Sequence, residues 1–228
     1  DQYREFYHHV GHAFDDPWLT LHNRAEGKIE YTNLLYVPSS KPFDLMNPDR
    51  KHRVKLYVKR IFITDDCEDL MPAYFRFVRG IVDSEDLPLN VSREMLQRNA
   101  VVQRIRTALV RRIFGELKKK AEKAPEEYAI FWADFGAVVK EGLYEDAGNR
   151  DRLFEISRFR STNGEDWISL ADYVGRMKKG QEEIYFITGD DIDQLRVSPQ
   201  LEGFSSRGIE VLLLNDPVDE FWLPTVGL

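Results

Sequence analysis

Two short apolar runs in the last third of the chain constrain its fold more than any other feature. Residues 184–187 read Ile-Tyr-Phe-Ile and residues 211–214 read Val-Leu-Leu-Leu, so both runs are apolar on both faces. Strands of a parallel sheet covered by helices have this composition, whereas a strand with one wet face alternates. Because residues 191–206 between them favour a helical crossover, we expect a right-handed βαβ unit there.

The first part of the chain contains further strand patterns. Residues 54–58 alternate apolar and polar side chains, which is typical of a half-buried strand, and residues 34–37 and 75–82 are apolar runs that also favour strands. Arg60 breaks the alternation before residues 61–63. We therefore expect a bulge or a buried strand end at that point.

Helical periodicity alternates with these strands. Residues 3–14 carry an aromatic face, and one apolar stripe at three- and four-residue steps contains Val102, Ile105, Leu109, Ile113 and Leu117. Pro125 marks a break, after which a new aromatic face begins. We expect the fold class α/β (α+β), with two αβα sandwich lobes joined by a helical connector. The larger lobe would cover residues 1–123 and the smaller one residues 124–228.

Composition excludes several classes of protein. The chain has 32 basic and 39 acidic residues and a formal net charge of −7, which argues against a globally basic nucleic-acid coat. Its single cysteine, Cys67, cannot form an internal disulfide or a paired-cysteine zinc site, which favours a reducing cytosol. A bilayer span takes roughly 18 apolar residues, and the longest uncharged stretch, residues 31–40, is shorter. The chain starts at Asp1 rather than Met, and we expect a piece of a longer protein.

Motifs for metal or nucleotide chemistry are sparse. The sequence has no glycine–lysine phosphate loop, no dinucleotide-binding glycine fingerprint, no HExxH and no GxSxG. His8 and His12 have a spacing that metal ligands on a helix can use, but no carboxylate is fixed relative to them, so we interpret them as surface or packing residues. The acidic run at residues 65–69 lacks the glycine and spacing of a calcium loop. We predict no metal site.

The basic helix expected at residues 98–123 allows two interpretations. It contains nine basic and two acidic residues, among them Arg104, Arg106, Arg111 and Arg112. These arginines could contact phosphate groups of RNA or of a lipid surface. We favour the alternative, a water-facing side of a helix whose apolar stripe is buried, because no aromatic residues interleave with the charges to stack on bases.

Residues 86–97 stand apart from these patterns. Pro88 stiffens an extended loop, and Ser92 suits a helix N-cap, whose hydroxyl accepts from an exposed backbone N–H. Arg93 would then lie in the first turn, where the helix end favours anions, and Gln97, four residues later, would lie on the same face. This spacing could hold a phosphate supplied from outside, and it also fits a capped surface helix.

The loop resembles the catalytic loop of a known family. In the ninety-kilodalton heat-shock protein chaperones, called HtpG in bacteria, this loop is similar to DSEDLPLNVSREMLQ at residues 83–97. The similarity continues in order through NLLYVPSSKPFDL (33–45), VKLYVKRIFITDD (54–66), FVRGIVDSEDLPLN (77–90), SLADYVGRMKKGQEEIYFITG (169–189) and GIEVLLLNDPVDEF (208–221). It covers essentially the whole chain and corresponds to the family's middle domain.

The resemblance implies a module of an ATP-dependent chaperone that is cytoplasmic and homodimeric when complete. Its partners would be partly folded client proteins and its own N-terminal nucleotide and C-terminal dimerisation domains. ATP and magnesium would be held mainly by the N-terminal domain, so the chain alone should be inactive. Arg93 matches the arginine supplied to the γ-phosphate, and Gln97 matches a second phosphate-side residue. Leu87 and Leu89 match positions that pack against the closed nucleotide domain.

Client binding is implied at three aromatic residues. Phe14 matches a client-contacting position on the first helix, and Phe221, followed by Trp222, matches an aromatic position near the C-terminal end of the domain. Pro224 departs from the polar residue of some relatives. The alternative is that these aromatics belong to a core or an interdomain surface. Two rival functions remain: an RNA- or phospholipid-binding module using residues 98–123, and a non-catalytic protein-docking scaffold. We expect neither a membrane nor a nucleic-acid partner.

Overall fold

The computed structural model describes residues 2–11, 14–47 and 53–226. The chain forms two compact units, of which the first ends at Glu116 and the second begins at Leu117. This division falls inside the helix α3 (Ala100–Lys123), upstream of the boundary that we placed at residue 124. Both units combine helices and a sheet, so the α/β class predicted from the periodicities is confirmed.

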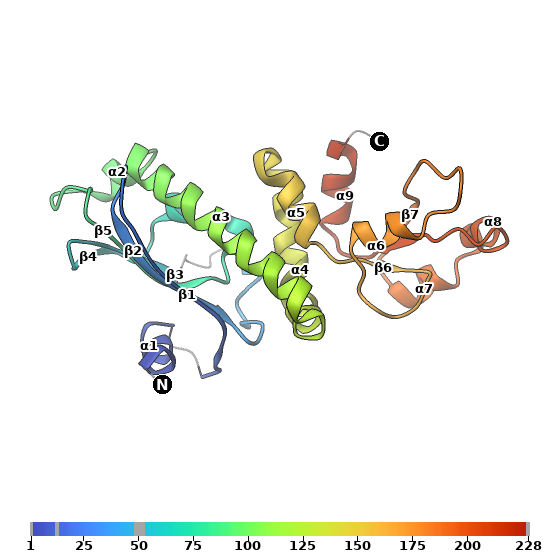
Figure 1. Cartoon of the computed structure of the whole chain (residues 1–228), viewed down its shortest axis with the longest axis horizontal. Helices are drawn as coiled ribbons and strands as arrows, with labels where there is room; N and C mark the ends of the chain where they lie inside the picture. Colours follow the sequence, from blue (N-terminus) through green and yellow to red (C-terminus); the bar gives the residue numbers. More distant parts are fainter. Residues whose placement is uncertain (1, 12–13, 48–52, 227–228) are drawn as a thin grey trace. The chain divides into compact units, whose positions relative to one another are not determined.

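The first unit is built on a mixed five-stranded sheet in the order β1-β2-β5-β3-β4 (Figure 1). The strands are β1 (Pro17–Ala25), β2 (Tyr31–Pro38), β3 (Arg53–Val58), β4 (Ile61–Thr64) and β5 (Arg79–Ser84). β5 pairs antiparallel with β2 and parallel with β3. The central strand of the sheet therefore leads directly into the segment that resembles a catalytic loop.

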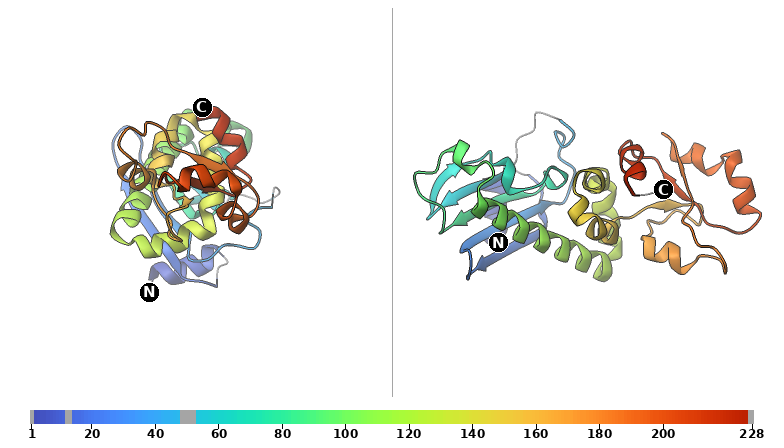
Figure 2. Two further views of the ribbon diagram at one scale, coloured as in Figure 1. Left: turned by 90° about the vertical axis from the view of Figure 1, so that its right-hand side faces the viewer. Right: turned by 90° about the horizontal axis from the view of Figure 1, so that it is seen from above.

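Helices cover both faces of this sheet. On one face α1 (Gln2–Gly11) packs through Tyr7 against Tyr36 of β2, with ring centroids 5.1 Å apart. The opposite face lies under α3, and Figures 1 and 2 show the two helices on opposite sides of the sheet. The apolar stripe of α3 is buried as predicted, which contributes roughly 1.5–3 kcal/mol for each large side chain. Phe114 of α3 adds a ring contact to Phe75 at 5.2 Å.

The break at Arg60 is a hairpin turn rather than a buried strand end, and the β3–β4 register shifts a few residues away, between Leu56 and Tyr57. Lys59 and Arg60 have φ values of 50° and 67°, the left-handed conformation that a two-residue type I′ turn needs at both central positions. Val58 of β3 lies opposite Ile61 of β4 across this turn. Asparagine and glycine usually mark such a turn, so a Lys-Arg pair carried no signal for it.

The remaining elements of the first unit are short. Two 3-10 helices, Glu68–Leu70 (η1) and Ala73–Phe75 (η2), lie between β4 and β5. The predicted strand at residues 75–82 therefore starts later than expected, at Arg79. The helix α2 (Arg93–Leu96) precedes α3.

The second unit contains the predicted βαβ connection. β7 (Phe186–Thr188) and β8 (Leu212–Leu214) pair in parallel, and α7 (Ile192–Arg196) lies between them in sequence. β6 (Arg160–Ser161) pairs antiparallel with β8, which gives the order β6-β8-β7. β8 is fully buried, whereas β7 is partly exposed, so only one of the two apolar runs is covered on both faces.

Helices and short turns complete this unit. The helices are α4 (Pro125–Glu145), α5 (Arg150–Ile156), α6 (Leu170–Gly175), α8 (Glu202–Ser205) and α9 (Asp219–Trp222). The 3-10 helices are Ala147–Asn149 (η3), Pro199–Leu201 (η4) and Leu223–Val226 (η5). Pro125 is the first residue of α4, where its missing N–H costs no hydrogen bond.

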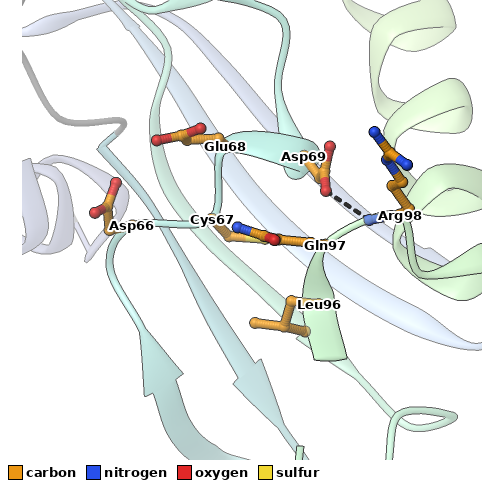
Figure 3. A pocket seen from close by; sticks show the side chains of 7 residues that line it. All are labelled: Asp66, Cys67, Glu68, Asp69, Leu96, Gln97 and Arg98. Carbon is orange, nitrogen blue, oxygen red and sulfur yellow. Dashed lines mark hydrogen bonds between the residues drawn. The ribbon is translucent and has the colours of Figure 1, made fainter. Parts of the chain in front are cut away.

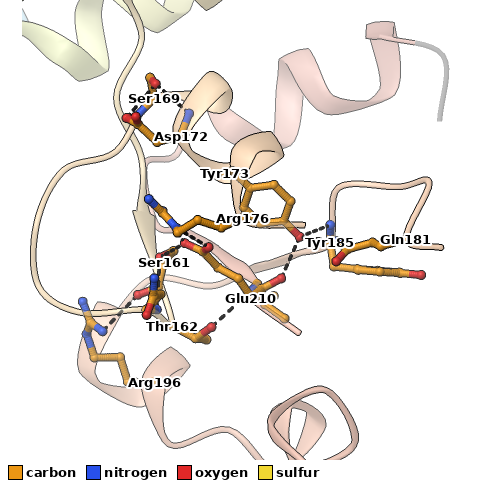
Figure 4. A network of polar contacts seen from close by, with 12 residues as sticks. Ser161, Thr162, Ser169, Asp172, Tyr173, Arg176, Gln181, Tyr185, Arg196 and Glu210 are labelled. Carbon is orange, nitrogen blue, oxygen red and sulfur yellow. Dashed lines mark hydrogen bonds and ion pairs between the residues drawn. The ribbon is translucent and has the colours of Figure 1, made fainter. Parts of the chain in front are cut away.

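A polar network joins α6, β6 and the segment before β8 (Figure 4). Arg176 donates two hydrogen bonds to the carboxylate of Glu210, at 2.9 and 2.8 Å, and the Ser161 hydroxyl donates a third at 2.6 Å. Tyr173 donates to the Glu210 carbonyl at 2.6 Å and accepts from the N–H of Tyr185 at 3.0 Å. These bonds hold segments that are far apart in the sequence.

The Glu210 carboxylate should make the second unit's stability depend on pH. Burial acts to raise its pKa, but the hydrogen bonds from Arg176 and Ser161 outweigh this and hold the pKa below its ordinary value. A depressed folded pKa gives stability that is present above the unfolded pKa and is lost as the pH falls through the folded pKa. We expect Glu210→Gln to cost about 1–2 kcal/mol of unfolding free energy at pH 7 and less at pH 3.

Urea denaturation of the unsubstituted chain and of Glu210→Gln, at pH 7 and at pH 3, measures this cost in unfolding free energy. Glu182→Gln is the matched control, because Glu182 is exposed and should show no such pH-dependent loss. An equal cost of Glu210→Gln at pH 7 and pH 3 would contradict the assignment.

Candidate functional site

The candidate site is the segment between β5 and α3. At the end of β5, the hydroxyl of the buried Ser84 accepts hydrogen bonds from the N–H groups of Asp86 and Leu87, both at 3.3 Å. Leu87 is only 1% exposed, whereas Leu89 is 51% exposed. The two leucines that we predicted as interdomain contacts therefore differ, since Leu87 belongs to the core of this unit and Leu89 faces outward.

The predicted N-cap at Ser92 is present. Its backbone is extended, with φ −94° and ψ 163°, and its hydroxyl accepts from the N–H of Met95 at 3.4 Å. Arg93 is the first residue of α2, as expected, while its side chain lies outside what the structure describes. A short capped turn thus begins at Arg93, the residue that we expect to contact phosphate.

Gln97 differs from its predicted placement. α2 ends at Leu96, and Gln97 is its C-cap with an extended ψ of 125°. The four-residue spacing from Arg93 therefore does not place the two residues on one helix face. The extended Gln97 ends the helix, and the next residue, Arg98, has a left-handed backbone with φ 56°. The Gln97 side chain is exposed and borders a cavity of about 280 Å³ (Figure 3).

This cavity is acidic. Its wall consists of Asp66, Cys67, Glu68, Asp69, Leu96, Gln97 and Arg98. The Asp69 carboxylate accepts a hydrogen bond from the backbone N–H of Arg98 at 2.8 Å (Figure 3). Three carboxylates would repel a polyphosphate, so the cavity beside the candidate loop does not fit a nucleotide.

Cys67 has the properties of a structural cysteine. It is buried, and burial, with a further contribution from the negative charge of Asp69, raises its pKa to about 11. The thiol is therefore protonated near neutral pH and is a poor nucleophile.

The three predicted client-binding aromatics lie in different environments. Phe14 is fully exposed but lies beyond α1, which ends at Gly11. On α9, Phe221 is 62% exposed and contacts Tyr144, whereas Trp222 is 5% exposed. The Trp222 indole donates to Asp219 at 2.8 Å and its ring contacts that of Phe154 at 5.7 Å. Trp222 is therefore a core residue, and its prediction as a client contact does not fit its position.

Sequence reasoning missed a buried ionic network beneath α9. Lys140 of α4 bonds to Asp219 at 2.6 Å and to Asp216 at 2.7 Å, and both Lys140 and Asp219 are buried. Lys140 and Asp219 are 79 residues apart, so no local spacing could have indicated the pair. The network fixes the base of the helix that presents Phe221.

Other sequence expectations concern metals, the basic helix and membranes. His8 bonds to the carbonyl of Asp15 at 2.9 Å, while His12 lies outside the described residues. Within the ranges that the structure describes, no three His, Cys, Asp or Glu side chains are grouped to hold a metal ion. Arg104, Arg111 and Arg112 are exposed beside the buried stripe of α3, as the water-facing interpretation predicts. No helix in the described part combines the length and apolarity needed to cross a membrane.

The capped loop and the two units can be compared with known proteins. The family model described as "Hsp90 protein" matches residues 1–227. The chain belongs to the Hsp90 family. The family resemblance stated from the sequence motifs is therefore confirmed.

Individual Hsp90 relatives agree over nearly the whole chain. Proteins described as "Chaperone protein HtpG" are 66% identical in Paramagnetospirillum magneticum and 58% identical in Rhodospirillum rubrum, in each case over 99% of this chain. The chain spans 36% of the length of these relatives. The solved middle domain of a heat shock protein from Plasmodium falciparum is 31% identical and superposes with a TM-score of 0.86, covering 98% of this chain and 88% of that one. This chain therefore has the fold of an Hsp90 middle domain.

The different environments of Phe221 and Trp222 can be tested by truncating each side chain. We expect Trp222→Ala to lower the unfolding free energy of the second unit by about 3–5 kcal/mol, because it removes a large buried ring and leaves Asp219 short of a donor. Phe221→Ala, the matched control on the same helix, should cost less than about 1 kcal/mol. Urea denaturation followed by circular dichroism measures both values. Similar costs for the two variants would contradict the placement of the rings.

Proposed function

We propose that this chain is the middle domain of an ATP-dependent molecular chaperone, and that it supplies Arg93 to the γ-phosphate of ATP held by the N-terminal domain of the complete protein. Membership of the Hsp90 family supports the proposal, as does the 66% identity to a relative described as "Chaperone protein HtpG". The chain spans 36% of that relative, so the relative is long enough to contain a nucleotide domain and a dimerisation domain as well.

The observation that carries the proposal is the construction of the segment before α3. Leu87 and Leu96 are buried, whereas Leu89 and Met95 between them are exposed, and Ser92 caps the turn that starts at Arg93. A first-turn arginine combines a permanent positive charge with a planar, five-donor head group. Such a group can neutralise charge on a transferring phosphoryl group when another domain delivers the nucleotide.

This chain would contribute donors and a packing surface to the reaction rather than the nucleotide pocket. The acidic cavity next to Gln97 does not fit ATP, so we place ATP and magnesium mainly in the N-terminal domain of the complete protein. Bound magnesium would neutralise phosphate charge there. We propose that Arg93 and Gln97 offer donors to the phosphate and that Leu89 packs against the closed nucleotide domain. Leu87 is not part of this contact, because its side chain is buried in its own unit.

Client binding by this chain is a further part of the proposal. Phe14 and Phe221 are exposed aromatics, so they are accessible to partly folded chains. We do not include Trp222, whose ring is packed in the core. We propose that the complete protein is cytoplasmic, in line with the single free and buried cysteine of this chain, and that it is a homodimer, as the family resemblance implies.

Substitution of Arg93 tests its assigned role. In the full-length protein we expect Arg93→Ala to lower ATP turnover at least about tenfold with little change in ATP affinity, because the arginine reaches the phosphate only after domain closure. Arg93→Lys should rescue poorly, since an ammonium group lacks the planar two-pronged grip. Gln97→Ala should be milder, because it removes one neutral hydrogen bond of roughly 0.5–1.5 kcal/mol. Steady-state ATPase assays and nucleotide titrations give both quantities.

Circular dichroism and melting of the Arg93→Ala chain provide the control. Both should match the unsubstituted chain. Unfolding of this variant, or unchanged turnover in the full-length protein, would show that the assigned role is wrong.

The chain alone should neither bind nor hydrolyse ATP and should be monomeric. The cavity beside the loop is lined by carboxylates, and the proposed nucleotide and dimer contacts lie in other domains. Calorimetry with ATP and sedimentation of residues 1–228 at micromolar concentration measure these properties. Micromolar ATP affinity or a stable dimer would count against the proposal.

A further inference from the structure

We propose that Asp69 is a positioning residue for the candidate catalytic segment, and that its carboxylate holds the joint between α2 and α3 in the conformation that orients α2. The joint consists of Gln97, Arg98 and Asn99, which separate the two helices. The inference rests on the proposed function, because it assigns a role in the same ATP turnover.

The first observation is the backbone of Arg98. Its φ of 56° is in the left-handed region, which a residue with a β-carbon adopts only at a conformational cost. This conformation follows the extended Gln97 that ends α2, and it lies two residues before the start of α3. A contact with a residue outside the joint must offset this conformational cost if the joint is to keep one geometry.

Asp69 provides that contact. Its carboxylate accepts the N–H of Arg98 at 2.8 Å, a charge-assisted hydrogen bond to the strained residue itself. Asp69 lies 29 residues earlier, on the 3-10 helix η1, where the adjacent Leu70 is fully buried. The backbone of Asp69 is therefore anchored beside the core of the first unit, and its carboxylate can serve as an anchor point for the joint.

Asn99 has a different role in the same joint. Its side-chain amide donates to the carbonyl of Met95 at 3.3 Å, and its side-chain oxygen accepts from the N–H of Val101 at 2.9 Å. Asn99 thus ties the two helices to each other, whereas Asp69 ties them to the rest of the unit. The buried Leu96 is a second anchor, but a four-residue helix held by one apolar side chain can still rotate about it.

Rotation of α2 would move its first residue, Arg93. A displacement of about 1 Å at a reacting group can cost up to roughly 100-fold in rate, so the orientation of α2 should affect turnover more than nucleotide binding. Asp69 itself need not touch the nucleotide.

The experiment compares substitutions in the full-length protein. We expect Asp69→Ala to lower ATP turnover at least about fivefold with an unchanged KM for ATP, and to speed amide hydrogen exchange in the peptide that spans the joint. Asp69→Asn keeps a neutral acceptor, so its turnover and exchange rate should lie between those of the unsubstituted protein and of Asp69→Ala. Glu68→Ala is the matched control, because it removes an adjacent negative charge from the same cavity wall and should leave turnover and exchange unchanged.

Rescue separates positioning from general stability. Glycine adopts a left-handed backbone without the cost that other residues incur, so Asp69→Ala combined with Arg98→Gly should recover most of the lost turnover. If Asp69→Ala does not fold, Asp69→Asn and its combination with Arg98→Gly carry the same comparison.

Two outcomes would overturn the inference. One is that Asp69→Ala has the same ATP turnover and the same amide exchange as Glu68→Ala. If Arg93→Ala is still slow in that case, the proposed function remains intact. The other is a loss in Asp69→Ala that Arg98→Gly does not relieve. Unchanged turnover in Arg93→Ala would instead reject the proposed function, and with it the orientation of α2 as the reason for any effect of Asp69.

Discussion

The burial of Leu87 and Leu96 fixes the two ends of the segment that we propose to act on ATP. Both side chains, and that of Val91 between them, belong to the core of the first unit, so the segment is anchored at three points. The segment is also short and follows the central strand β5, which is paired on both sides. An exposed loop attached in this way keeps a defined shape before any partner arrives, which lowers the entropy that docking must overcome.

The same core explains which parts of the fold were predictable. Burial on one side imposes a period on the sequence, so the stripe of α3 and the alternation of β3 were visible without coordinates. The cap at Ser92 was visible because its signal is local and chemical. The βαβ connection was visible because its strands are apolar and the segment between them favours a helix.

What could not be predicted depended on residues far apart or on backbone conformation. The early end of α2 depends on the extended backbone of Gln97, and the hydrogen bond from Arg98 to Asp69 spans 29 residues, so the sequence showed neither. Lys59 and Arg60 form a turn that other residues usually fill. Phe221 and Trp222 are neighbours of similar character, and Trp222 is internal because it contacts Asp219 and the rings of Phe154 and Phe159. The family motif pointed to a region of the chain but could not separate its exposed residues from its core residues.

Cys67 gives this arrangement a practical consequence. The thiol lines the same cavity as Gln97 and Asp69, is buried, and has a pKa raised to about 11. Alkylating reagents attack the thiolate, which is scarce at this raised pKa. Because the sulfur is buried, reagents should reach it only when the cavity wall opens. It is the only cysteine in the chain. The rate at which Cys67 is alkylated thus reports how often the wall shared with the α2–α3 joint opens, with no probe introduced into the protein.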